Sequence, residues 1–278
     1  MVNDRRSPTC ELRPSPKQSV TGYSFNDSEA YDQFMGRWSH KIGKAFLTWL
    51  QPPKGAHWLD VGCGTGIFTE LISVSCAPAS VIAVDPAESQ IARARKGVAR
   101  KAEFRLADAQ ELPFPDESFD VVASALVMNF VPNRARAMSE MRRVARPGGL
   151  VAACVWDLAA ELSPSGPLRR AMRQIGIDAP PVPGTAASAP AALVDLFEEA
   201  RLKGLNTTSI DVAVSFRDFD DFWRSQTQHN MPTTKVIAAM TPSDRLALME
   251  AVRTYLRPLR GGVGYSARAN AVRGHCSA

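Results

Sequence analysis

The sequence predicts an α/β fold with a doubly wound, mainly parallel sheet. Two observations support this fold class. Short apolar runs typical of buried parallel strands alternate with helical patterns between about residues 57 and 157, and a glycine-rich turn joins the first strand to the first helix. Right-handed crossovers in such a sheet bring the turns that follow its strands to one edge. We therefore expect the ligand-binding groups to lie at that edge.

The composition is that of an ordinary globular protein, with 45% hydrophobic and 22% charged residues among 278. This length suits one α/β domain with insertions. No apolar run approaches the roughly 18 residues that span a bilayer, and no apolar signal-peptide core opens the sequence, which favours a cytoplasmic protein without a membrane span. The five cysteines are odd in number and form no C-x-x-C pair, so neither a disulfide framework nor a metal site is indicated.

The net charge of +5 is compatible with binding to phosphate groups. However, the basic residues are spread along helical segments without interleaved aromatic residues. This distribution favours solvated helix faces and disfavours a nucleic-acid partner. The sequence does not indicate an oligomeric state.

Two segments precede the first strand. Residues 1–22 are rich in proline and serine and have almost no apolar periodicity, so we expect a disordered tail. Residues 23–50 carry aromatic and aliphatic residues at helical spacing, which predicts two short helices or one helix broken near Gly36. In the simplest interpretation, these aromatic residues pack the helix onto the sheet.

The stretch from His57 to Thr69, HWLDVGCGTGIFT, carries the strongest signal. A buried-strand pattern leads into three alternating glycines, and a helical pattern follows from Ile67 to Ser75. The glycines are Gly62, Gly64 and Gly66. Because glycine lacks Cβ, the backbone can take positive φ and approach a ligand, which the N–H groups of the helix start then face.

The spacing of the glycines narrows the choice of ligand. In a G-x-G-x-x-G pattern counted from Gly62 the third glycine would fall on Ile67, so the dinucleotide fingerprint is not matched and a nicotinamide enzyme is a weak alternative. No Gly-Lys-Ser/Thr follows, which argues against a P-loop. Asp60 stands two places before the first glycine and suits a ligand with a cationic or amino end. A turn of this composition without any ligand is a further alternative.

The strand and helix patterns continue in alternation after the glycine turn. The sequence predicts strands at Val81–Val84, Ala102–Leu106, Phe119–Ser124 and Leu150–Trp156, with an amphipathic helix at Arg134–Arg146. Asp85 ends the second of the sheet's strands beside the glycine turn. A carboxylate at that place can accept hydrogen bonds from both hydroxyl groups of a ribose.

The C-terminal part changes in composition. Residues 158–192 are rich in proline, alanine and serine, which is typical of a lid or mobile insertion. The alternation of Thr208–Phe216 predicts a strand, and residues 217–258 are mostly helical and form a second insertion that we interpret as a substrate cover. Gly264–Arg273 is predicted to return as an antiparallel edge strand. Residues 51–278 therefore form the main α/β domain, with lid insertions at about 158–192 and 217–258.

The run Asp60-Val61-Gly62-Cys63-Gly64-Thr65-Gly66 resembles motif I of the class I S-adenosylmethionine (SAM) dependent methyltransferases, in particular the type 11 or UbiE-like group that acts on small molecules. The resemblance is specific over residues 57–157. It implies a Rossmann-like, seven-stranded sheet with an antiparallel last strand. It also implies SAM as the cofactor and S-adenosylhomocysteine as the product, and it makes residues 23–50 an N-terminal helical lid over the cofactor or substrate.

The same resemblance assigns roles to individual residues. It places Asp60 near the amino group of SAM, Asp85 at the ribose and Asp108 at the adenine amino group. The implied cofactor contacts are Asp60, Gly62, Cys63, Gly64, Gly66, Asp85, Pro86, Asp108, Ala109, Met128 and Asn129. The implied substrate or lid contacts are Tyr31, Arg37, Trp38 and Trp156, with His40 a further lid candidate.

Methyl transfer from SAM requires little from the protein beyond alignment of the acceptor and exclusion of water, because the sulfonium is already activated. A general base is required only where the acceptor must lose a proton. The candidates are His40, Asp157 and His229, although nothing in the sequence brings a partner to any of them. We therefore expect a methyltransferase with a small-molecule acceptor and no metal. An RNA or protein methyltransferase, a SAM-binding protein without transferase activity and a noncatalytic partner subunit are the alternatives.

Overall fold

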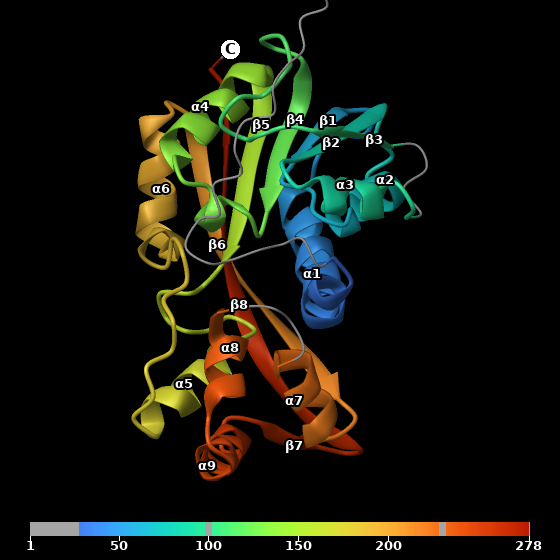
Figure 1. The fold of residues 1–278 in the computed structure, drawn as a ribbon. Helices are drawn as coiled ribbons and strands as arrows, with labels where there is room; N and C mark the ends of the chain where they lie inside the picture. Colours follow the sequence, from blue (N-terminus) through green and yellow to red (C-terminus); the bar gives the residue numbers. More distant parts are fainter. Residues whose placement is uncertain (1–27, 98–101, 228–231, 278) are drawn as a thin grey trace, which may run out of the picture.

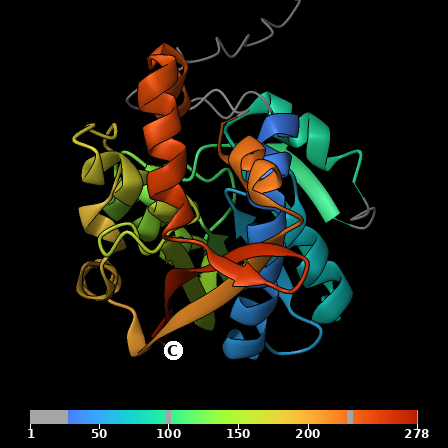
Figure 2. The same ribbon diagram turned by 90° about the horizontal axis from the view of Figure 1, so that it is seen from below.

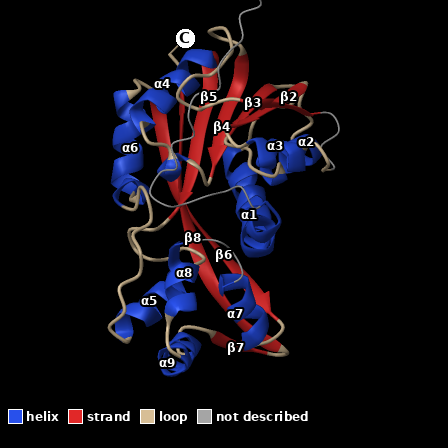
Figure 3. Cartoon of the chain, viewed as in Figure 1, coloured by secondary structure: helices blue, strands red, loops and turns tan. Residues whose placement is uncertain are grey.

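The computed structural model describes residues 28–97, 102–227 and 232–277, and within them it has the α/β fold class that the sequence predicts (Figures 1 and 3). The predicted tail of residues 1–22 and the base candidate His229 lie outside the described residues. The strands are β1 His57–Val61, β2 Ser80–Asp85, β3 Ala102–Leu106, β4 Phe119–Ala125, β5 Ala145–Trp156, β6 Lys203–Phe216, β7 Arg257–Leu259 and β8 Gly262–His275. The helices are α1 Ser28–Leu50, α2 Ile67–Ser75, α3 Glu88–Ala94, α4 Arg134–Val144, α5 Gly166–Gln174, α6 Pro190–Glu199, α7 Phe219–Thr227, α8 Pro232–Ala239 and α9 Pro242–Arg253, with short 3-10 turns η1 Met128–Phe130 and η2 Ala186–Ser188.

The described strands form one sheet in the order β3-β2-β1-β4-β5-β8-β6, with β7 paired to β8 beside this path. The first five strands are parallel, whereas β8 is antiparallel to both β5 and β6. The mainly parallel sheet with a reversed last strand is therefore confirmed. The prediction that this strand lies at the edge is wrong: β8 is interior, and β6 is the edge strand. The exposure of the strands explains this, because β8 is rich in buried alanines while β6 has a largely exposed, polar face.

Helices cover both faces of the sheet. On one face α1 and α2 pack on residues such as Trp58, Val121 and Ala123, which belong to the larger hydrophobic core. On the other face α4 and α6 pack on Leu59 and Val122 and their neighbours. Adjacent residues of β1 and β4 thus serve opposite cores, because successive side chains of a strand point to opposite faces.

Helix α1 runs without interruption from Ser28 to Leu50, so the predicted break near Gly36 is wrong. A glycine inside a helix costs about 1 kcal/mol relative to alanine, which packing can offset. Trp38, Ile42 and Phe46 are all fully buried on the sheet side of α1. At the C-terminal end of the helix, the guanidinium of Arg273 donates a 2.6 Å hydrogen bond to the carbonyl of Leu50. The positive charge there also interacts favourably with the negative end of the helix dipole.

The strands β6 and β8 continue past the end of β5 as a two-stranded ribbon, which leads to a lower group of α5, α7, α8, α9 and β7 (Figure 1). Viewed from below, the orange and red strands of this ribbon run beside the blue helix α1 (Figure 2). An aromatic cluster joins the parts: the ring of Trp38 lies 4.9 Å from that of Tyr265 and 6.1 Å from that of Trp156. The two predicted insertions supply the helices of the lower group.

Candidate functional site

The turn between β1 and α2 is wound by its three glycines. Gly62, Gly64 and Gly66 have φ angles of 80°, 52° and 88°, in the left-handed region that glycine adopts without strain. The N–H groups of Gly62 and Cys63 both donate to the carbonyl of Val84, at 2.8 and 2.9 Å. The turn is therefore tied to the end of β2, at the edge of the sheet where ligands bind in this class of fold.

The three glycines face different surroundings. A Cβ on Gly62 would lie 2.5 Å from the side chain of Val127, and one on Gly66 would lie 3.2 Å from the Cβ of Ala94. Among the residues that the structure describes, a Cβ on Gly64 would meet nothing closer than the Gln90 side chain at 4.0 Å. Gly62 and Gly66 thus allow close packing of the protein itself, whereas Gly64 leaves open space that a ligand could fill.

Asp85 ends β2 and faces this turn. Its carboxylate accepts hydrogen bonds from the N–H of Gly64 at 3.0 Å and from the N–H of Ala87 at 2.9 Å. Burial raises the pKa of Asp85, while these two backbone donors lower it. Because an ionised carboxylate has about four acceptor positions, Asp85 keeps the capacity to accept hydroxyl groups of a ligand. The neighbouring Pro86 is exposed.

Asp60 lies beneath the turn and has no exposed surface. One carboxylate oxygen accepts a 2.6 Å hydrogen bond from the hydroxyl of Thr69, and the other has no partner in the part of the chain that the structure describes. Burial raises the pKa of Asp60 to about 7; the Thr69 hydrogen bond opposes this shift and the charge of Asp85 adds to it. Burial also raises the pKa of the Cys63 thiol.

The end of β4 contributes Met128 and Asn129. Met128 is fully buried in the core under α4, whereas the Asn129 side chain, 3% exposed, donates to the carbonyl of Pro183 at 3.5 Å. The Asn129 side-chain oxygen has no partner among residues 28–97, 102–227 and 232–277. A Cβ on Gly184 would lie 2.2 Å from the Asn129 carbonyl oxygen, so the 183–184 segment packs directly on this residue.

The adenine candidates lie one strand further out. Asp108 is exposed and accepts hydrogen bonds from the backbone and side chain of Gln110, at 2.8 and 3.0 Å. Ala109 is buried. The N–H of Ala107 donates to the Asp85 carbonyl at 3.2 Å, which brings this segment next to the ribose candidate. The role of Asp108 stays a prediction.

The lid candidates join α1 to the ribbon. Arg37 forms an ion pair with Asp221 of α7 at 3.3 Å, and Trp38 is buried between Trp156 and Tyr265. The side chain of Tyr31 lies outside the described residues.

Among the base candidates, His40 is exposed, and Asp157 accepts from the N–H of Ala160 at 3.0 Å, as expected for an aspartate that stabilises a turn. Over the described ranges, no three His, Cys, Asp or Glu residues come together in an arrangement that could hold a metal ion.

The structure therefore brings Gly62, Gly64, Asp85 and Asp60 together at the carboxyl ends of β1 and β2. Sequence reasoning missed three supporting contacts: the hydroxyl of Thr69, the side chain of Val127 and the 183–184 segment. Only the last had a visible signal, a Pro-Gly pair inside a proline-rich insertion.

The family model described as a methyltransferase domain matches residues 59–153. Demethylmenaquinone methyltransferase from Symbiobacterium thermophilum is 37% identical over 129 residues, which cover 44% of this chain and 51% of that protein. The ubiquinone/menaquinone biosynthesis C-methyltransferase UbiE of Brucella canis is 38% identical over 146 residues, which cover 48% of this chain and 54% of that protein. Phosphatidylethanolamine N-methyltransferase from Cereibacter sphaeroides is 41% identical over 103 residues, covering 35% and 49%. The chain thus spans about half the length of the curated relatives it matches.

Solved structures share the fold. The YcgJ protein from Bacillus subtilis has a TM-score of 0.57 at 15% identity, over 86% of this chain and 100% of that chain. A second structure is phosphoethanolamine N-methyltransferase 2 from Haemonchus contortus, solved with phosphomonomethylethanolamine and S-adenosylhomocysteine. It has a TM-score of 0.58 at 17% identity, over 93% of this chain and 58% of that chain. Residues 59–153 therefore form a methyltransferase domain, and the chain shares its fold with these solved structures.

Proposed function

We propose that this protein transfers a methyl group from SAM to a small-molecule acceptor. The observation that carries the proposal is the pairing of Asp85 with the backbone of Gly64 at the sheet edge, beside open space over Gly64. A carboxylate held in this way is suited to the hydroxyls of a ribose, and a turn without side chains lets the rest of the cofactor approach the backbone.

The residues present fit SAM. Asp85 has acceptor positions left for the ribose, and Gly64 leaves space for the methionine part. Asp60 supplies a buried carboxyl group, one oxygen of which has no partner among the described residues, and this favours a cationic group above the turn. The side-chain oxygen of Asn129, also without a partner in that part of the chain, offers a further acceptor near the end of β4. Asp108 and Ala109 are the proposed adenine contacts.

When bound, SAM supplies an activated methyl donor. The protein then has to align the acceptor with that methyl group and exclude water. Both lower the activation barrier, the first through proximity and the second through desolvation of the reacting groups. Helix α1 and the segment around Pro183 border the carboxyl ends of β4 and β5, where the acceptor would enter. No general base is assigned, because within the described part of the chain His40 is exposed and the Asp157 carboxylate is occupied by the turn hydrogen bond from the N–H of Ala160.

A small-molecule acceptor is favoured by the relatives, which are named for demethylmenaquinone, for ubiquinone/menaquinone biosynthesis and for phosphatidylethanolamine. We infer an acceptor of that size class without choosing among oxygen, nitrogen, carbon and sulfur. None of the described helices is long and apolar enough to cross a membrane. The cytoplasmic setting stays a prediction, as do the roles of residues 23–50, 158–192 and 217–258 as lids.

Isothermal titration with SAM, S-adenosylhomocysteine and NAD in parallel tests the cofactor. We expect saturable binding of the first two and none of NAD. Binding of NAD alone, or of none of the three, contradicts the proposal. A screen of small acceptors with isotopically labelled SAM then separates a transferase from a SAM-binding protein. Labelling of RNA or protein instead of small molecules would contradict the acceptor class.

A further inference from the structure

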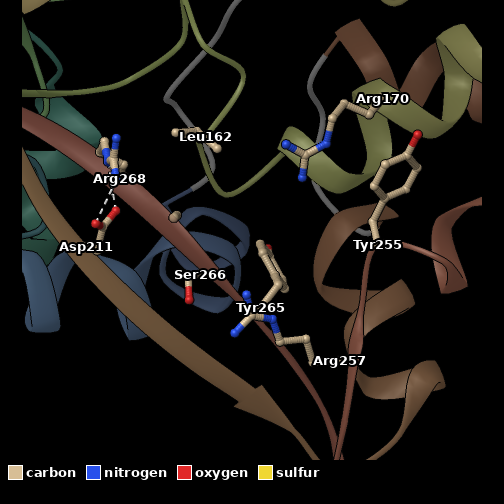
Figure 4. A pocket seen from close by; sticks show the side chains of 9 residues that line it. Leu162, Arg170, Asp211, Tyr255, Arg257, Tyr265, Ser266 and Arg268 are labelled. Carbon is tan, nitrogen blue, oxygen red and sulfur yellow. Dashed lines mark hydrogen bonds and ion pairs between the residues drawn. The ribbon is translucent and has the colours of Figure 1, made fainter.

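A second recess lies in the lower part of the molecule and shares no residue with the glycine turn. It has a volume of about 420 Å³ and is bounded by β8, by Arg170 of α5, by Tyr255 and Arg257 at the start of β7, and by Leu162 and Asp211 (Figure 4). Its walls combine aromatic and apolar surface from Tyr255, Tyr265 and Leu162 with the guanidinium groups of Arg170 and Arg257. The sequence patterns did not single out this place.

One wall of the recess is a short open stretch of sheet edge. On that edge of β8, Gly264 pairs with Arg257 of β7, and the N–H of Arg268 donates to the carbonyl of Leu162 at 2.7 Å. Alternate residues of an antiparallel strand direct their backbone groups to the same edge, so the N–H and C=O of Ser266 face the recess between these two pairs. Within the described residues nothing pairs with Ser266 on that side.

The charges of the recess are unbalanced. Arg268 is neutralised by a two-pronged ion pair with Asp211, with both N–O distances 2.9 Å. Neither Arg170 nor Arg257 has an acidic partner among the residues that the structure describes. In Figure 4 the Arg257 side chain runs from β7 towards Tyr265 and Ser266. The Arg170 guanidinium points from α5 into the recess.

Arg170 is held in place by contacts that leave donors available. Its guanidinium lies 5.1 Å from the centre of the Tyr255 ring and donates to the carbonyl of Glu161 at 3.3 Å. Its Nε is buried and has no hydrogen-bond partner in the described part of the chain. A buried donor without a partner costs free energy, and a planar guanidinium is matched by the two oxygens of a phosphate or carboxylate.

We propose that this recess binds a small molecule that carries a phosphate or carboxylate group, held by Arg170 and Arg257 and by the N–H of Ser266. The ring of Tyr255 and the side chain of Leu162 contact the apolar remainder of the ligand. This site goes beyond the proposed methyl transfer and does not depend on it, since none of its residues belongs to the glycine turn.

Titration of the full chain with phenyl phosphate, benzoate and uncharged benzyl alcohol tests the proposal. We expect saturable binding of one or both anions and none of the alcohol, and the two anions distinguish a phosphate site from a carboxylate site. In Arg257→Gln and in Arg170→Gln, binding of the preferred anion should weaken about 10 to 100-fold, as expected for loss of a charged hydrogen bond. The matched control is Arg260→Gln, an exposed arginine on the same hairpin outside the recess, which should leave binding unchanged.

Arg257 is exposed, so its substitution tests the site even if loss of the Arg170 to Tyr255 contact destabilises the fold. Absence of saturable anion binding to the wild type overturns the proposal. Equal anion binding by the wild type and Arg257→Gln, or equal weakening in Arg260→Gln, does so too. SAM titration of the same proteins keeps the two proposals separate: anion binding without SAM binding overturns the methyltransferase proposal alone, and the reverse result overturns the recess alone.

Discussion

The glycine turn between β1 and α2 and the β6–β8 ribbon are held together by different kinds of contact. In the turn the N–H of Gly66 donates to Cys63 at 2.9 Å, and Thr69 reaches Asp60 nine positions away. In the ribbon the contacts join distant residues, such as the 2.8 Å hydrogen bond from Ser209 to Asn270. The turn thus combines local hydrogen bonds and positive φ angles with close packing against Val127, whereas the ribbon is made by pairing between strands far apart in the chain.

This difference predicts where the protein is sensitive to substitution. The turn has positive φ angles, a clash distance of 2.5 Å beside Gly62 and a fully buried carboxyl group, so small changes there should be costly. The polar face of the ribbon is exposed, so its ion pairs should contribute little. Substitutions in the two regions test whether the turn is the more sensitive of the two.

The largest effect is expected for Gly62→Ala. A side chain at φ 80° costs about 1–2 kcal/mol, and the Cβ placed against Val127 adds about 1–3 kcal/mol of overpacking, so unfolding should become easier by about 2–5 kcal/mol. Urea unfolding measures this. The control is Gly148→Ala, at φ 72°, where a Cβ would have no atom of the described residues within 4 Å; it should lose only the conformational part of this free energy. Equal losses of unfolding free energy in the two variants would show that close packing of Gly62 against Val127 does not contribute.

The second test uses the buried carboxyl group of Asp60. Because its pKa rises from 3.8 to about 7, the folded protein holds a proton that the unfolded chain lacks between these values. The free energy of unfolding contributed by this group therefore falls as the pH rises from about 4 to about 7. The free energy of unfolding of Asp60→Asn should therefore rise relative to that of the wild type by on the order of 3 kcal/mol between about pH 4 and pH 8.

Urea unfolding of both proteins over this pH series measures the difference. Asp178→Asn, at an exposed aspartate, is the control and should follow the wild type. If the curves of wild type and Asp60→Asn stay parallel, Asp60 does not titrate as its burial implies.

Asp85→Asn tests the ligand side of the turn. The variant keeps the size of the side chain but loses the charge that would accept two ribose hydroxyls, so SAM affinity should fall by about 1–3 kcal/mol. Isothermal titration measures this, with circular dichroism as the check on folding. The exposed Asp195→Asn serves as the control. Undiminished SAM affinity in a folded Asp85→Asn protein excludes Asp85 from the ribose contact.

The smallest effect is expected on the ribbon. Arg268 and Asp211 form a two-pronged pair, but their side chains are 38% and 55% exposed. A double-mutant cycle with Arg268→Ala and Asp211→Ala should give a coupling of only about 0.2–1 kcal/mol, because solvent screens exposed pairs. A coupling of several kcal/mol would mean that the ribbon, too, depends on single contacts, and would break the contrast with the turn.

The helix Ile67–Ser75 was predicted with the bounds that the structure has, because a glycine turn and an apolar helical pattern are both local signals. The placement of β8 was wrong, since no local pattern states that a strand will be inserted between β5 and β6. The break near Gly36 was wrong for a related reason: burial of Trp38 and Ile42 outweighs the weak helix propensity of one glycine.

The site divides in the same way. Asp60, the three glycines and Asp85 could be found from spacing alone, because a backbone approach requires glycine and the ends of neighbouring parallel strands meet. The open space over Gly64, the packing of the 183–184 segment on Asn129 and the roles of Arg37 and Trp38 at the ribbon could not, because each depends on residues distant in the chain.

By itself, then, the sequence determined the fold class and the glycine turn, since short-range periodicity and glycine conformation are properties of neighbouring residues. The methyltransferase domain of residues 59–153 was indicated by the resemblance of its motif. Only the tertiary structure decided which strand is interior, that Arg170 and Arg257 line one recess, and how far Asp60 is removed from water. Those features arise from packing between segments far apart in the chain, whose burial and charge no local pattern specifies.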